Sequence, residues 1–285
     1  MLLLQALDVP YVVAGFLVGM LVGLTGVGGG SLMTPILILL FGTSPATAVG
    51  TDLLFAAATK TVGSLVHGYN HTIEWRIVFR LAAGSIPATA LTLVLLAALH
   101  MSSGGARHLI VAVIALALLL TAVMLIARGK VTAFAAPRLG RLDESTIAKL
   151  TVAMGAVLGV LVTVSSVGAG AIGVTALVLL YPRVATKRIV GSDIAHAVPL
   201  TLLAGLGHGT LGTLDLHALT WLLVGSFPGI FIGSVLSARV PDVALRYVLA
   251  TVLFIVGGRM ALDVVTQTRP NVAALSTVVA PRPGH

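Results

Sequence analysis

Eight apolar stretches, each about as long as a membrane-spanning helix, occupy most of the chain. A helix needs about 20 consecutive apolar residues to cross the hydrocarbon core of a bilayer. The stretches lie at 9–27, 46–67, 77–99, 108–127, 149–167, 188–208, 216–238 and 244–262. A helix satisfies its own backbone hydrogen bonds in lipid. The sequence therefore predicts an all-α polytopic membrane protein.

The composition fits a surface that faces lipid. Charged residues make up 9% of the chain, whereas soluble domains carry about 25%. The net charge of +8 matches the excess of Lys and Arg in the cytoplasmic loops of membrane proteins. No basic run is interleaved with aromatic residues, so nucleic-acid binding is excluded. The absence of cysteine excludes disulfides and Cys-ligated metals or clusters.

An internal repeat relates the two halves of the chain. Four glycines recur at an offset of 140 residues, and after one extra residue the offset becomes 141. The matching residues are Gly15, Gly19, Gly28 and Gly30 with Gly155, Gly159, Gly168 and Gly170, Gly50-Thr-Asp52 with Gly191-Ser-Asp193, His67-Gly68 with His208-Gly209, Glu74 with Asp215, and Gly84-Ser-Ile-Pro87 with Gly225-Ser-Phe-Pro228. We predict a first transmembrane repeat at 1–127, a basic cytoplasmic linker at 128–149, a second repeat at 150–268 and a flexible tail at 269–285.

Glycine interrupts the first apolar stretch of each half. The interruptions are Gly26-Val-Gly-Gly-Gly-Ser31 and Ser165-Ser-Val-Gly-Ala-Gly170. The segments that follow, 31–41 and 171–181, are too short to span a bilayer alone. Broken, half-length helices at matching positions of two repeats are typical of transporter binding sites.

The distribution of charge predicts the topology. If each broken segment is a re-entrant hairpin followed by three transmembrane helices, the two repeats are inverted relative to each other. Twelve Lys and Arg residues then lie on one side and four on the other. If each broken segment crosses once, the division is ten against six. The excess of positive charge in cytoplasmic loops favours the hairpins, with both termini outside.

The glycine breaks are candidates for anion binding. Glycine admits unusual backbone angles, and the N-terminus of the following half-helix presents unpaired N–H groups and partial positive charge. Neighbouring hydroxyls, among them Thr34 and Thr163, add donors. The predicted substrate-binding residues are Thr25, Gly26, Gly28, Gly29, Gly30, Ser31, Lys60, Ser165, Ser166, Gly168 and Gly170. The alternative is close helix packing, which Gly15-xxx-Gly19-xxx-Gly23 and Gly225-xxx-Gly229-xxx-Gly233 are expected to provide.

Ionisable residues inside apolar segments form a second set of candidates, because a charge at the bilayer centre costs at least about 2.5–3.5 kcal/mol. Lys60 is the natural counter-charge for an anion. Asp52 and Asp193 are either proton carriers or helix caps. His67 and His208 have either a structural or a proton-transfer role. His196 is also intramembrane.

A metal site at His67-xxx-His71 is disfavoured, because Gly68 and Asn70 lie between the two histidines and argue against a regular helix. We expect no metal and no cofactor.

The glycine-rich run from Gly26 to Leu37, followed by Ala48-Val-Gly-Thr-Asp52 and Gly84-Ser-Ile-Pro87, resembles the sulfite exporter TauE/SafE family. The resemblance extends from about residue 10 to 262. It departs in the second half, where Ala169 replaces the middle glycine and Thr175 replaces the proline. The resemblance implies a bacterial inner-membrane permease for small sulfur-containing anions such as sulfite or sulfoacetate.

Together these features predict a secondary transporter, not an enzyme, with proton or gradient coupling and alternating access. A permease or channel for a non-sulfur anion is one alternative, and an intramembrane enzyme is another. The expected partners are a small anionic substrate, the lipid bilayer and, as an open option, a second copy of the chain in a homodimer.

Overall fold

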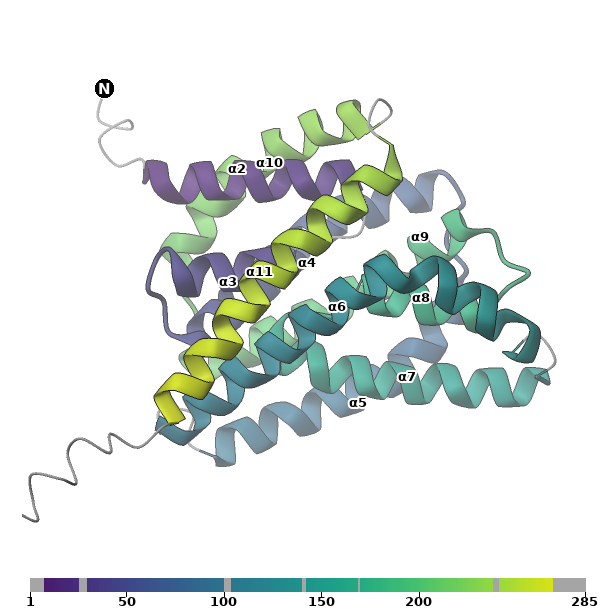
Figure 1. Ribbon diagram of the computed structural model, residues 1–285, viewed down its shortest axis with the longest axis horizontal. Helices are drawn as coiled ribbons and strands as arrows, with labels where there is room; N and C mark the ends of the chain where they lie inside the picture. The colour runs from purple at the N-terminus through teal and green to yellow at the C-terminus, as the bar shows by residue number, and fades with distance from the viewer. Residues whose placement is uncertain are drawn as a thin grey trace, which may run out of the picture.

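The computed structural model describes residues 8–25, 30–99, 104–139, 142–168, 170–237 and 241–268. These residues form ten helices and no strand, which confirms the all-α prediction (Figure 1). The helices are α2 (Val9–Thr25), α3 (Gly30–Leu39), α4 (Pro45–Tyr69), α5 (Trp75–Ala98), α6 (Gly104–Leu139), α7 (Glu144–Ser165), α8 (Ala171–Leu180), α9 (Thr186–Thr210), α10 (Leu216–Ser237) and α11 (Asp242–Thr268).

Six of the described helices are long and apolar enough to cross a membrane: α5, α6, α7, α9, α10 and α11. Of the other two predicted spans, α2 has 17 residues and α4 has 25. α4 has the length to cross but contains Asp52 and Lys60 among small residues, which lowers its hydropathy. The chain is a multi-pass helical membrane protein.

The glycine breaks lie where the sequence predicts them. α2 ends at Thr25 and α3 begins at Gly30, and residues 26–29 lie outside the described residues. In the second half, Gly168 has φ 122° and Gly170 has φ 144°, angles that residues with a Cβ rarely adopt. The following helices α3 and α8 have ten residues each, about 15 Å of helix against a hydrocarbon core about 30 Å thick.

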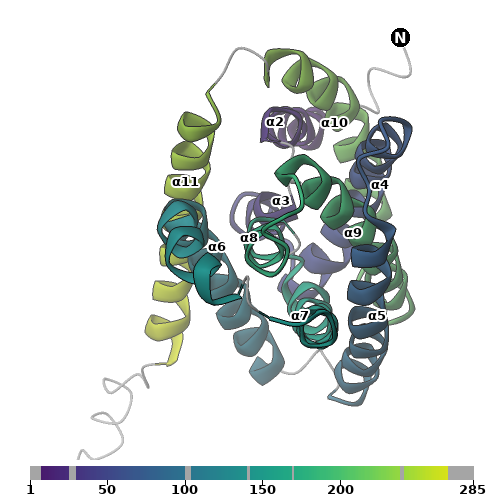
Figure 2. The same ribbon diagram turned by 90° about the vertical axis from the view of Figure 1, so that its right-hand side faces the viewer.

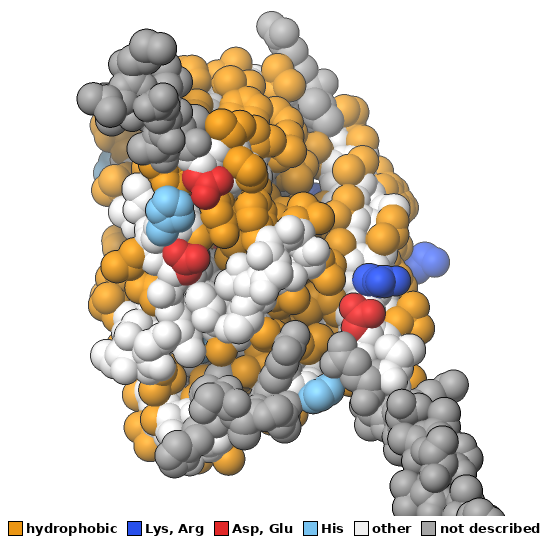
Figure 3. Space-filling view, turned by 90° about the vertical axis from the view of Figure 1, so that its left-hand side faces the viewer, with side chains coloured by type: hydrophobic (Ala, Val, Ile, Leu, Met, Phe, Trp, Pro, Cys, Tyr) orange, Lys and Arg blue, Asp and Glu red, His pale blue; other side chains and the backbone are white. Residues whose placement is uncertain are grey.

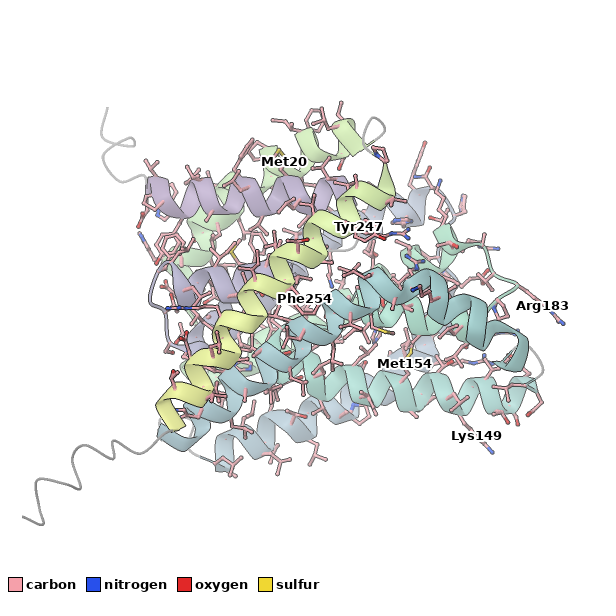
Figure 4. All side chains as sticks on the ribbon, viewed as in Figure 1. Met20, Lys149, Met154, Arg183, Tyr247 and Phe254 are labelled. Carbon is pink, nitrogen blue, oxygen red and sulfur yellow. The ribbon has the colours of Figure 1, made fainter. Side chains whose placement is uncertain are left out.

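The two broken segments begin at opposite ends of the molecule. In Figure 1, α2 begins at the left-hand end, where the α3–α4 connection also lies. α7 begins at the right-hand end, and Figure 4 places Arg183, in the α8–α9 connection, at that same end. This arrangement is what an inverted repeat would give. The inversion across a bilayer and the assignment of the two ends to its two sides stay predictions.

The two halves exchange partners instead of packing as separate units. α2 packs along α10 and α7 along α5, while α4 pairs with α9 and α6 with α11. In the end-on view of Figure 2, α3 and α8 lie in the middle, with the longer helices around them. The broken helices are therefore enclosed by the rest of the protein.

Glycines allow the exchanged helices to approach closely. A Cβ added at Gly84 would overlap the carbonyl oxygen of Val152, and one added at Gly225 would overlap that of Val12. Val152 and Val12 are themselves related by the repeat. Gly15, Gly19 and Gly23 likewise face the α10 backbone, and Gly229 and Gly233 face α2. The predicted packing role of these glycine series is confirmed.

The helix ends on either side of the predicted linker differ from those expected from the sequence. The predicted linker at 128–149 is partly helical, because α6 continues to Leu139 and α7 begins at Glu144. Asp143 is the N-cap residue of α7, because its carboxylate accepts hydrogen bonds from the Ser145 and Thr146 backbone N–H groups. These bonds and the two neighbouring hydroxyls hold the pKa of Asp143 well below its usual range. The predicted tail at 269–285 lies outside the described residues.

The outer surface is apolar, as lipid contact requires. Side chains such as Leu65 and Phe231, 69% and 72% exposed, project outward from α4 and α10. Figure 3 shows hydrophobic side chains spread over much of one face.

Gly84→Ala should destabilise the protein, because the new Cβ must displace the Val152 backbone. Overpacking of this kind costs about 1–3 kcal/mol. Gly258→Ala is the matched control, since a Cβ there meets nothing within 4 Å. We expect a lower thermal unfolding midpoint in detergent for Gly84→Ala and an unchanged or higher one for Gly258→Ala. Equal midpoints for the two variants would contradict the packing described here.

Candidate functional site

Asp52 connects α4 to the half-helix α3. Its Oδ2 accepts hydrogen bonds from the Thr34 backbone N–H at 3.1 Å and from the Thr34 hydroxyl at 2.6 Å. The carboxylate is fully buried, and Ser166, just after α7, lies close to it. Asp52 thus lies where elements from the two glycine breaks meet.

Asp193 has a corresponding position in the second half. It lies against α8, because a Cβ added at Gly173 would overlap its Oδ1. Its surroundings nevertheless differ from those of Asp52. At the 140-residue offset Thr34 corresponds to Val174, which has no hydroxyl, and the neighbouring Thr175 donates its hydroxyl to Ala171 in its own helix. The two carboxylates therefore occupy matching places with different partners.

Lys60 is buried near both carboxylates. Lys60 is 5% exposed, and it interacts electrostatically with both carboxylates. One cation and two acidic groups are thus enclosed at membrane depth. The helix-cap alternative for the acids is wrong: α4 is capped by Ser44 and α9 begins after Ala185, so both acids lie two turns inside their helices.

Several buried polar atoms in the described residues have no hydrogen-bond partner. They are Asp52 Oδ1, Asp193 Oδ1, Ser166 Oγ, His196 Nδ1 and Ser226 Oγ. Buried polar atoms are normally satisfied by protein, water or a ligand. Three of these atoms, on Asp52, Ser166 and Asp193, lie beside the half-helices α3 and α8, so water or a ligand could bind there.

The predicted substrate-binding residues divide into three groups. Thr25, Gly30 and Ser31 lie at helix ends, but their side chains fall outside the described part, as do Gly26, Gly28 and Gly29 entirely. Ser165 is engaged in ending α7, with its hydroxyl 2.7 Å from the Leu161 carbonyl and 3.2 Å from the Val167 N–H. Ser166, Gly168, Gly170 and Lys60 remain as predicted candidates with described geometry.

His67 and His208 occupy the ends of α4 and α9. His67 Nδ1 is 2.7 Å from the Thr72 hydroxyl, and His208 Nδ1 is 2.9 Å from the Thr213 hydroxyl. The loops beyond them bind the opposite helix: the Glu74 N–H donates to Ser192 and the Asp215 N–H to Thr51. These two reciprocal contacts obey the 141-residue offset. Each histidine therefore holds a loop that is hydrogen-bonded to the other of the two helices α4 and α9. We call these two matching contacts the clasps at His67 and His208.

A groove of about 200 Å³ reaches Lys60. It is lined by Val22, Gly23, Thr59, Lys60, Val62, Gly63, Val66, His67, Ile194, Ile230 and Ser234. These residues come from α2, α4, α9 and α10, beside the first glycine break. Lys60 is the charged group among them.

The corresponding region of the other half is closed. There His208 Nε2 donates to the Thr163 carbonyl at 3.0 Å. Leu93, the counterpart of Ser234, packs on Gly207, where a Cβ would overlap it. His208 is 1% exposed, whereas His67 lines the open groove. The structure thus combines one open and one closed version of the same arrangement.

Sequence reasoning did not assign a role to His196 or name its partner. His196 is fully buried, and its Nε2 is 2.8 Å from the Ser85 hydroxyl. The sequence does distinguish this histidine, because the repeat places Phe55 at the position equivalent to His196, so the first half has no histidine there. Ser226, the counterpart of Ser85, consequently lacks a partner.

Comparison with known proteins identifies the family. The model of the family described as "Sulfite exporter TauE/SafE" matches residues 11–260. "Probable membrane transporter protein YjnA" of Bacillus subtilis (strain 168) is 36% identical over 255 residues, 88% of this chain and 98% of that protein. "Probable membrane transporter protein YdhB" of the same organism is 27% identical, covering 81% of this chain and 91% of that protein. No solved structure matches the chain.

The family match extends over both halves and reaches into all six apolar spans, and it agrees with the predicted bacterial inner membrane. The chain belongs to the TauE/SafE sulfite exporter family of membrane transporters.

Proposed function

We propose that this transporter is a secondary carrier for a small sulfur-containing anion, sulfite or an organosulfonate. The observation that carries the proposal is Lys60, a buried cation at the end of a groove beside a glycine break. The name of the matching family supports sulfur oxyanions as the substrate class. A carrier of this kind performs no chemical step on its substrate, so we assign no catalytic residue.

The anion binds between Lys60 and the half-helices. The first turns of α3 and α8 present backbone N–H groups and the positive ends of helix dipoles toward the middle of the protein. Gly30 and Gly170 stand at those turns. Ser166 contributes its hydroxyl, which lies close to Asp52.

Charge balance favours coupling to protons. With both carboxylates ionised, Asp52, Asp193 and Lys60 carry a net charge of −1, and an entering anion makes the buried charge more negative. Such a charge is strongly disfavoured in an environment of low dielectric constant. A proton taken up by Asp52 or Asp193 offsets the charge of a monoanion. We assign the proton to Asp193, because Asp52 is held by Thr34.

The open and closed halves support alternating access. In the other state, the groove at Lys60 closes as the region around His208 and Thr163 opens. Inverted repeats that exchange conformations interconvert two such states. A continuous channel would have no need for this asymmetry. A carrier for a non-sulfur anion would share the same charge arrangement and remains the second candidate.

Replacing Lys60 should abolish transport. We expect Lys60→Met to lose uptake of sulfite and sulfoacetate into liposomes, because no cation then offsets the anion. Lys60→Arg, which keeps the charge, should retain at least part of the flux. Unchanged flux in Lys60→Met would remove Lys60 from the binding site. Flux of chloride or bicarbonate alone would favour the second candidate.

Single cysteines can report the two states, because the chain has no native cysteine. We expect Ser234→Cys, in the open groove, to react rapidly with a charged thiol reagent, and its counterpart Leu93→Cys to react slowly. A substrate gradient that favours the other state should slow the first reaction and speed the second. Rates that change in the same direction would contradict alternating access.

A further inference from the structure

A second cavity, distinct from the groove at Lys60, lies at the opposite end of the molecule from the start of α2. It has a volume of about 610 Å³ and is lined by residues that include Glu74, Arg76, Ile77, Glu144, Tyr181 and Arg183. They come from α5, α7 and the α8–α9 connection. Figure 4 shows Arg183 at the right-hand end, beyond the helices. This end carries the basic connection that we predict to be cytoplasmic.

The two carboxylates of this cavity are already paired. Glu144 accepts a hydrogen bond from Arg80 at 2.6 Å, and Glu74 forms an ion pair with Arg188 at 2.9 Å. Arg80 and Arg188 therefore offset the negative charge within the protein. The Tyr181 hydroxyl, which bonds Arg80 and Thr151, fixes one wall.

Two arginines remain as surplus positive charge. The Arg76 side chain is 72% exposed, and its contact with Glu144 is long, at 3.4 Å. Arg183 makes no ion pair within the described part of the chain. Guanidinium groups match the oxygens of a phosphate through paired hydrogen bonds. The cavity rim is therefore complementary to an anion.

The remaining surface favours an anion attached to an apolar body. Ile77, Ile147 and Leu180 line the cavity. Just beside it, Trp75 and Phe79 lie on the outer face of α5, 56% and 67% exposed. Trp residues at helix ends are typical of the level of the lipid headgroups, and Trp75 is the first residue of α5. A cavity at that level is within reach of a lipid headgroup.

We propose that this cavity binds the phosphate of an anionic phospholipid, with Arg76 and Arg183 on the headgroup and the apolar residues against the start of its acyl chains. Basic pockets between transmembrane helices on the cytoplasmic side are suited to such headgroups. The site is separate from the transport site and does not depend on the identity of the transported anion.

The test is lipid-dependent thermal stabilisation of the detergent-purified full chain. A lipid that binds only the folded state raises the unfolding midpoint. We expect phosphatidylglycerol to raise it by at least about 2 °C relative to phosphatidylcholine. Arg76→Gln and Arg183→Gln should each lose most of this shift. Arg259→Gln, which removes an equally exposed arginine near the other end of the molecule, should keep it.

Inorganic phosphate provides the second arm, because it has the headgroup charge without acyl chains. We expect it to give no shift at the concentration at which the lipid acts. An equal response to phosphate would overturn the lipid assignment. A phosphatidylglycerol shift that is equal in all three variants, or no such shift in the wild type, would overturn the site.

Discussion

The burial of three ionisable side chains, Asp52, Lys60 and Asp193, is the constraint on which the rest of the structure depends. Ionised side chains are costly at membrane depth unless paired or solvated, and these three are almost fully buried. They are tolerated because they lie between helices, next to two glycine breaks and one groove. Around them, exchanged helix pairs with glycine contacts build a closely packed shell whose outside is apolar.

The repeat builds the scaffold, and departures from the repeat create the site. The glycine contacts, the clasps at His67 and His208, and the two carboxylates all follow the offset between halves. Three features do not. Lys60 corresponds to Thr201, His196 to Phe55, and the carboxylate partner Thr34 to Val174. A symmetrical scaffold with asymmetrical chemistry can expose one end of a site while it closes the other.

Much of this organisation is predictable from the sequence. Helix breaks follow from glycine's backbone freedom, and close helix pairs follow from glycines four residues apart, so both are local signals. The contact of Asp52 with Thr34 is not predictable, because it depends on how α3 folds back onto α4. The extension of α6 to Leu139 is also missed, since polar residues beyond a span resemble a loop. The cap alternative for Asp52 fails because Ser44 already begins the helix.

The central claim, that a small sulfur anion binds at Lys60, is tested most directly by ligand-dependent thermal stabilisation. The midpoints of the wild type and of Lys60→Met would be compared in sulfite, sulfate, thiosulfate, sulfoacetate, taurine, bicarbonate and chloride. A ligand specific for the folded state raises the midpoint by mass action. The account predicts that one or two sulfur oxyanions stabilise the wild type and not Lys60→Met. Stabilisation that is identical in both proteins, or produced only by non-sulfur anions, would contradict it.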